Sequence, residues 1–157
     1  MAAPPLPERF ATAEMRVRLA LIVSSYKRLT KRALIETSGD VAEALWHAPL
    51  AIAAHGSETD PLFFFGNRIA LDCFETDVQD FCAMPSRLSA EPVLREARQA
   101  VLDRVRRHGF IADYSAVRIS ATGRRFRIEH ATVWNLIDEQ GAIHGQAAAF
   151  KHWTDLP

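Results

Sequence analysis

The chain has few cysteines and no recognisable arrangement of metal ligands. Only Cys73 and Cys82 occur among 157 residues, and their spacing matches no zinc motif. The six histidines include no His-x-x-x-His pair, so the sequence predicts no metal site. A chain of this length buries roughly 70% of its unfolded surface and needs no disulfide for stability. Free thiols are typical of a reducing compartment, and we expect a cytoplasmic location.

The chain also lacks an excess of either charge. Nineteen Lys and Arg residues balance nineteen Asp and Glu residues. This argues against a nucleic-acid-binding protein, because such proteins are usually strongly basic. The apolar run at residues 19–23 is far too short to span a bilayer, and residues 1–9 show no signal peptide. We therefore expect no membrane partner.

No set of side chains indicates nucleophilic catalysis. Ser24, Ser25 and Ser57 lack the glycine-elbow sequence that presents a serine nucleophile. Asp138 and Glu139 fall in a predicted turn, where neighbouring carboxylates are usually solvated. An enzyme of unknown reaction is therefore a third functional hypothesis, with no residues assigned to it.

The N-terminal segment is amphipathic. Residues 1–7 are rich in proline and predicted to be disordered, and residues 8–37 are predicted to form a flanking helix. Apolar residues three and four positions apart form a seam along this helix. The seam either packs on the domain's own sheet or joins two chains in a homodimer. The candidate interface residues are Met15, Leu19, Ile22, Tyr26 and Leu29.

Residues 38–157 alternate strand and helix patterns in an order typical of one α+β domain. Two early strands, two short helices and a long helix are predicted at 50–54, 62–65, 68–74, 78–83 and 92–108. Three more strands form an antiparallel meander at 115–120, 125–136 and up to residue 150. The prediction is a five-stranded antiparallel sheet with helices on one face, and the N-terminal helix as a second cover.

The strand at 125–136 carries aromatic and polar residues on one face. Aromatic side chains with a few polar groups are typical of a ligand pocket, and equally of a filled core whose polar atoms are satisfied. Both interpretations stay open. Period-two alternation predicts this face to hold Phe126, Ile128, His130, Thr132, Trp134 and Leu136.

Several segments resemble the PAS fold of sensor domains. A strand runs into Asn67 and a short helix that ends at Phe74, and a linking segment follows. More specifically, the chain resembles bacterial MEKHLA-domain proteins. This PAS-related family also supplies the last domain of certain plant homeodomain–leucine zipper regulators, whose homeodomain has no counterpart here. The resemblance covers residues 41–153 and is carried by 55–61, 66–74, 84–92, 113–115, 123–128 and 131–150.

The resemblance implies a cavity between sheet and helices, which in PAS domains often holds flavin, haem or a small metabolite. Light-sensing PAS domains have a reactive cysteine just before an arginine, where this chain has Ser86-Arg87. A flavin adduct is therefore not expected, since the thiolate is missing. His108 lies at the end of the long helix beside Gly109, a position that suits the helix dipole better than haem ligation. The identity of any cofactor stays unknown.

The same analogy supplies the candidate pocket residues. Tyr114 and Arg118 are expected near the mouth, where an arginine either binds a carboxylate or forms an outward salt bridge. Asn67 either contributes to the pocket or ties its own loop by side-chain hydrogen bonds. The candidate ligand-binding residues are Asn67, Tyr114, Arg118, Phe126, His130 and Trp134.

Two functional hypotheses lead. The first is a stand-alone sensor or regulatory domain that binds a small organic ligand or a protein partner, with the N-terminal helix passing on the signal. The second is a ligand-free dimerisation or protein-interaction module built on the same helix.

Overall fold

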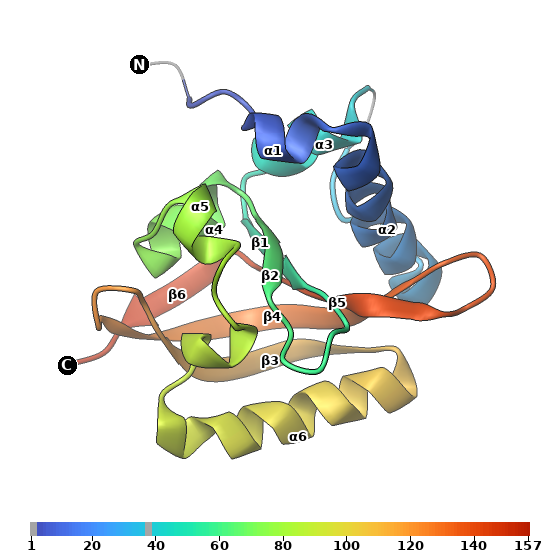
Figure 1. Ribbon diagram of the computed structural model, residues 1–157. Coiled ribbons are helices and arrows are strands. Elements are labelled where there is room, and N and C mark those ends of the chain that lie inside the picture. The colour runs from blue at the N-terminus through green and yellow to red at the C-terminus, as the bar shows by residue number, and fades with distance from the viewer. Residues whose placement is uncertain (1–2, 37–38) are drawn as a thin grey trace.

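The computed structural model describes residues 3–36 and 39–157 and confirms the α+β class (Figure 1). The helices are α1 (Glu8–Ala11), α2 (Ala13–Thr30), α3 (Val41–Trp46), α4 (Arg68–Phe74), α5 (Val78–Phe81), the 3-10 helix η1 (Ser86–Ser89) and α6 (Pro92–His108). The strands are β1 (Ala51–His55), β2 (Phe63–Gly66), β3 (Phe110–Ile119), β4 (Arg125–Ile137), β5 (Ile143–Phe150) and β6 (His152–Asp155).

One antiparallel sheet organises the domain. Five strands follow the order β2-β1-β5-β4-β3, as a closing meander with the first hairpin beside it. The sequence did not predict the sixth strand. Strand β4 is thirteen residues long, and β5 pairs only with the second half of β4, at 132–137. Strand β6 therefore pairs with the first half of β4, at 126–129.

The N-terminal segment is two helices rather than the single helix predicted. Thr12 has an extended backbone, and its hydroxyl caps α2 by accepting from the Met15 amide at 3.1 Å. Lys31 ends α2 in the left-handed conformation, earlier than the predicted end of the helix at residue 37. The Trp46 indole donates to the Pro4 carbonyl at 2.8 Å, which ties residues 3–7 to α3. The predicted boundary at residues 37–38 lies outside the described residues.

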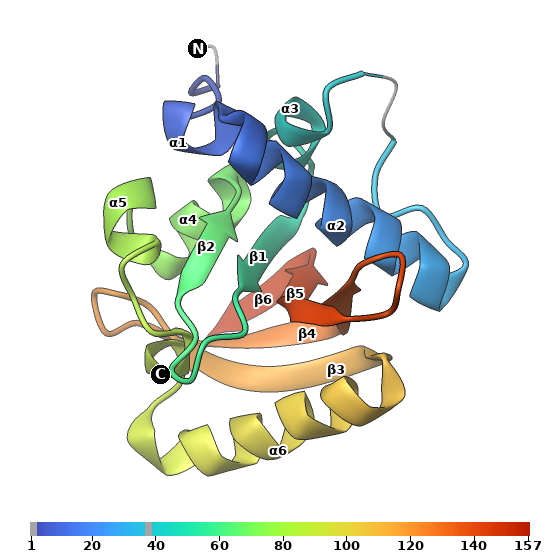
Figure 2. The same ribbon diagram turned by 45° about the vertical axis from the view of Figure 1, so that its right-hand side comes forward.

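Helices cover both faces of the sheet at β4. Trp134 donates to the Ile22 carbonyl of α2 at 3.1 Å, whereas Asn135 donates to the Val105 carbonyl of α6 at 3.0 Å. Since adjacent strand residues point to opposite faces, α2 and α6 lie on opposite sides of the sheet (Figure 2). Leu19 and Ile22 of the predicted seam are fully buried against the sheet. Met15, Tyr26 and Leu29 pack at the edge of the same core.

A bulge in β4 overturns the predicted alternation of its side chains. His130 has a positive φ of 53°, and Asp113 on β3 has 57°. The pairing register of the two strands shifts in this region. Phe126, before the bulge, packs against Phe74 of α4, whereas Trp134, after it, faces α2. The prediction that these residues share one face is wrong, because the extra residue changes the phase of the strand.

Candidate functional site

A small chamber of about 60 Å³ lies between the sheet and the helices α4 and α6. Its walls are mostly apolar, and a few polar side chains converge on it, as in many ligand sites. The apolar walls come from Phe63, Phe74, Ile128, Val133, Ala148 and Phe150, and the polar groups from His55, Ser89, Arg98, Tyr114, Arg118 and Gln146.

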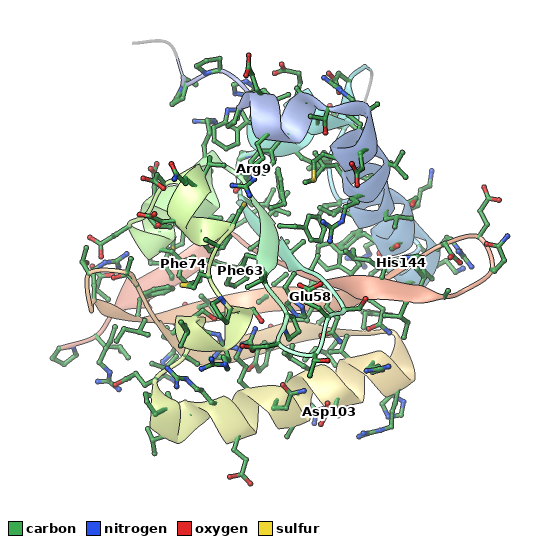
Figure 3. The ribbon with its side chains drawn as sticks, in the orientation of Figure 1. Arg9, Glu58, Phe63, Phe74, Asp103 and His144 are labelled. Carbon is green, nitrogen blue, oxygen red and sulfur yellow. The ribbon has the colours of Figure 1, made fainter. Side chains whose placement is uncertain are left out.

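A wider vestibule of about 480 Å³ adjoins the chamber. The loop after β1 forms one side of it and α6 forms the other. Figure 3 shows Glu58 of that loop and Asp103 of α6 on this side of the molecule, and both line the vestibule. Four residues line both spaces, so the vestibule is the natural route into the chamber: His55, Arg98, Leu102 and Gln146.

Two arginines reach the chamber from different elements. Arg98 comes from α6 and Arg118 from β3, and both are buried. Arg118 donates to the Val117 carbonyl at 2.8 Å and to the Tyr114 hydroxyl at 3.3 Å. Neither guanidinium pairs with a carboxylate of residues 3–36 or 39–157. Burial and the nearby Arg118 charge lower the pKa of Arg98 to about 10.

His55 stands where the chamber meets the vestibule, at the end of β1. Its Nδ1 is 2.9 Å from the Gly56 carbonyl. A carbonyl only accepts, so Nδ1 carries the proton and Nε2 is an acceptor. That Nε2 is buried and has no partner among the described residues. Burial, and secondarily the Arg98 charge, lower the pKa of His55 to about 4, although its bond to Gly56 opposes the shift.

The structure brings together two of the six predicted ligand-binding residues. Tyr114 and Arg118 line the chamber. Phe126 lies behind Phe74, and Trp134 faces α2. His130 is exposed on the bulge and pairs with Asp113 at 2.5 Å.

The side chain of Asn67 forms hydrogen bonds to backbone groups and has a structural role. Its side-chain oxygen accepts from the amides of Ile52 and Ala70, both at 3.0 Å. Its side-chain nitrogen donates to the carbonyls of Leu45 and Leu50, at 3.1 and 2.7 Å. Asn67 is fully buried, so it joins β1, the end of α3 and the start of α4 without facing the chamber.

The sequence reasoning missed Arg98, His55 and Gln146. The sequence signal for the burial of Arg98 was its spacing. It stands four residues before Leu102 and seven before Val105, and residues with this spacing lie on the same, inward-facing side of α6. His55 ends a strand that is buried along its whole length. Gln146 donates to the Leu102 carbonyl at 2.9 Å, a contact that only the folded structure reveals.

The chamber does not fit the cofactors that PAS domains often hold. Its volume is far below the roughly 300 Å³ at which sites for drug-sized ligands begin, so a flavin ring does not fit. Ser86 is buried at the start of η1 and offers a hydroxyl in place of a thiol. His108 is exposed at the C-terminal end of α6. No cluster of His, Cys, Asp or Glu in the described residues is arranged to hold a metal ion.

Two further properties bear on the class of protein. In the ranges 3–36 and 39–157, no helix combines the length and apolarity that crossing a membrane requires. Cys73 and Cys82 are both buried and free, and burial raises the pKa of the Cys73 thiol to about 12.

Comparison with known proteins extends this picture. The model of the MEKHLA domain family matches residues 17–155. The homeobox-leucine zipper protein HOX10 of Oryza sativa subsp. indica is 28% identical over 127 residues, which are 77% of this chain but only 15% of that protein. Further curated relatives include homeobox-leucine zipper proteins of Oryza sativa subsp. indica and Arabidopsis thaliana, which give no support to the bacterial origin in the predicted resemblance.

Solved structures confirm the PAS-like fold. A PAS domain from Colwellia psychrerythraea aligns with a TM-score of 0.61 at 15% identity, covering 73% of this chain and 92% of that one. A PAS domain of a LuxR-family transcriptional regulator from Burkholderia thailandensis, in complex with ethanol, aligns with a TM-score of 0.54 at 16% identity, covering 72% and 94%. At these identities the likeness establishes the fold alone.

Proposed function

Because the chain belongs to the MEKHLA domain family and has a PAS-like fold, we propose that it is a sensor domain with a small organic ligand in its chamber. The observation that carries this proposal is a set of buried polar groups around the chamber whose charge or hydrogen-bonding capacity is not fully matched by the described residues. Arg98 and Arg118 are buried without a carboxylate partner in the described residues, and Nε2 of His55 has no partner there either. Buried polar groups are usually satisfied, and such exceptions concentrate at functional sites.

The size and position of the chamber also support a small ligand. The related PAS domain from Burkholderia thailandensis is described with ethanol, a molecule of only three non-hydrogen atoms. The vestibule supplies a route for a ligand of this size between the β1–β2 loop and α6.

Native mass spectrometry of freshly purified protein tests the proposal. We expect a bound mass of a small organic molecule that is lost on denaturation. Ala148→Val adds two carbon atoms to the chamber wall and should remove the bound mass. Ala97→Val, at an exposed position of α6, is the matched control and should keep it. Only bare protein, together with no thermal shift from a library of small metabolites, would refute ligand sensing.

Homodimerisation through the N-terminal helix is a second proposal. Leu19 and Ile22 are used in the core, so a dimer has to form on the outward side of α2. The observation that favours such a surface is Val17, whose side chain is 68% exposed. Light scattering on the purified protein and on Val17→Glu is the test. A dimer that Val17→Glu dissociates supports the proposal, and a wild-type monomer rejects it.

We also propose a cytoplasmic location. The support is the state of the two cysteines, which are buried and free in the folded domain. Cell fractionation with a specific antibody tests this location directly.

A further inference from the structure

The charge of the chamber indicates the class of ligand. We propose that the ligand is a small monocarboxylate, whose carboxylate binds between Arg98 and Arg118 and whose short apolar part contacts Ile128, Val133 and Phe150. This inference rests on the proposed sensor function and deepens it.

The two guanidiniums require an anion for electrostatic reasons. A buried charge is costly unless it is paired, and two like charges in one chamber raise the cost. Arg98 and Arg118 line the same chamber, so their positive charges act on the same space. Arginine presents a planar fork of donors that fits a carboxylate in a bidentate manner. A carboxylate between them relieves both the desolvation of the charges and their mutual repulsion.

The protein's own acids around the vestibule have other partners. Glu58 accepts from the Leu62 amide at 2.7 Å. Asp60 pairs with Arg87 at 3.1 Å. Asp103 accepts from the Gln99 amide nitrogen at 2.8 Å. With these carboxylates held on the rim, the compensating charge has to come from a ligand.

The volume and walls favour a carboxylate with a short tail over an inorganic anion. A chamber of about 60 Å³ holds roughly four to six water-sized atoms. Apolar side chains form most of its walls, and they leave the far half of an inorganic phosphate without donors. In propionate, the carboxylate matches the charged side of the chamber and the two-carbon tail matches its apolar side.

Calorimetric titration with sodium propionate at constant ionic strength tests the inference. Neutral propionamide, which has the same shape, and inorganic phosphate are the comparison probes. We expect propionate to bind and propionamide to bind at least tenfold more weakly. Equal binding of propionamide, or tighter binding of phosphate than of propionate, would overturn the monocarboxylate assignment.

Variants connect the binding to the two arginines. Arg98→Met and Arg118→Met should each weaken propionate binding at least tenfold, while Arg104→Met, exposed on α6, should leave it unchanged. Circular dichroism confirms that each variant is folded, and two independent variants keep the test valid if one of them fails to fold. Propionate binding retained in both folded variants would reject the inference.

The outcomes also separate this inference from the sensor proposal. A neutral molecule found in the chamber by native mass spectrometry contradicts the monocarboxylate and leaves the sensor in place. Bare protein that responds neither to propionate nor to other small metabolites contradicts both.

Discussion

Arg98→Met should stabilise the unliganded protein, although it removes a large side chain from the interior. A pKa lowered from the ordinary 12.5 to about 10 corresponds to roughly 3 kcal/mol against the charged side chain in the folded state. Methionine keeps most of the unbranched length of the side chain and removes the charge. We expect a net gain of about 1–3 kcal/mol in the free energy of unfolding, as when other buried charges are replaced by apolar residues.

The assay is urea and thermal unfolding of ligand-free protein at pH 7. In a domain of this size, about 1 kcal/mol raises Tm by about 2–4 °C. The folded wild-type protein disfavours the charged form of Arg98. The resulting loss of stability is fully present below pH 10 and fades as pH rises through about 10 towards 12.5. The gain should therefore be constant between pH 6 and 9.

Arg104→Met is the control, since that side chain is exposed on the same helix and should change stability by less than about 0.5 kcal/mol. A clear loss of stability in Arg98→Met would refute the reasoning. It would mean that Arg98 contributes to the fold, and that its burial is structural rather than a cost carried for a ligand.

Three other measurements follow. Asn67→Ala removes four hydrogen bonds and leaves the buried Ile52 amide without its partner, so urea unfolding should show a loss of about 3 kcal/mol or more. The lowered pKa of His55 means that stability is complete above about pH 6.5 and falls as pH drops towards about 4. The fall should reach about 3 kcal/mol in unfolding measured across that range. Cys73, with a pKa of about 12, should resist iodoacetamide at pH 8 in the folded protein, as mass spectrometry will show.

Each of these has its own control. Asn67→Asp keeps both accepting bonds but buries a carboxylate, so it should also destabilise, and a neutral effect of either substitution contradicts the structural role of Asn67. His55→Gln cannot titrate, and its stability should fall less between pH 6.5 and 4 than that of the wild type. Equal slopes would show that other groups cause the acid sensitivity. Alkylation of Cys73 as fast in native protein as in urea would contradict its burial.

Local patterns in the sequence predicted most of the fold. The closing meander follows from β-branched runs between glycine-containing turns, and α6 follows from Pro92 and Gly109 at its two ends. The break at Thr12 and the strand β6 were not predicted. Thr12 is compatible with a helix until its hydroxyl caps the next turn, and β6 exists only because part of β4 is left unpaired by β5.

The chamber was harder to predict than the sheet. Period-two alternation assumes an unbroken strand, and the bulge at His130 changes its phase. A charged residue in a helix is normally solvated, so Arg98 gave no sign of burial apart from its spacing to Leu102 and Val105. Tyr114 and Arg118 were found through family resemblance, which carries three-dimensional information that composition and periodicity lack.

Strand β4 also has a mechanical property, because two of its neighbouring side chains face opposite sides of the sheet. Val133 lines the chamber, and its neighbour Trp134 supports α2 through the Ile22 carbonyl and the ring of Tyr26, 4.9 Å away. The peptide unit between them is planar and stiff. A ligand that shifts the backbone at Val133 would therefore shift the tryptophan on which the N-terminal helix rests. The thickness of a single strand separates the interior of this protein from the helix on its opposite face.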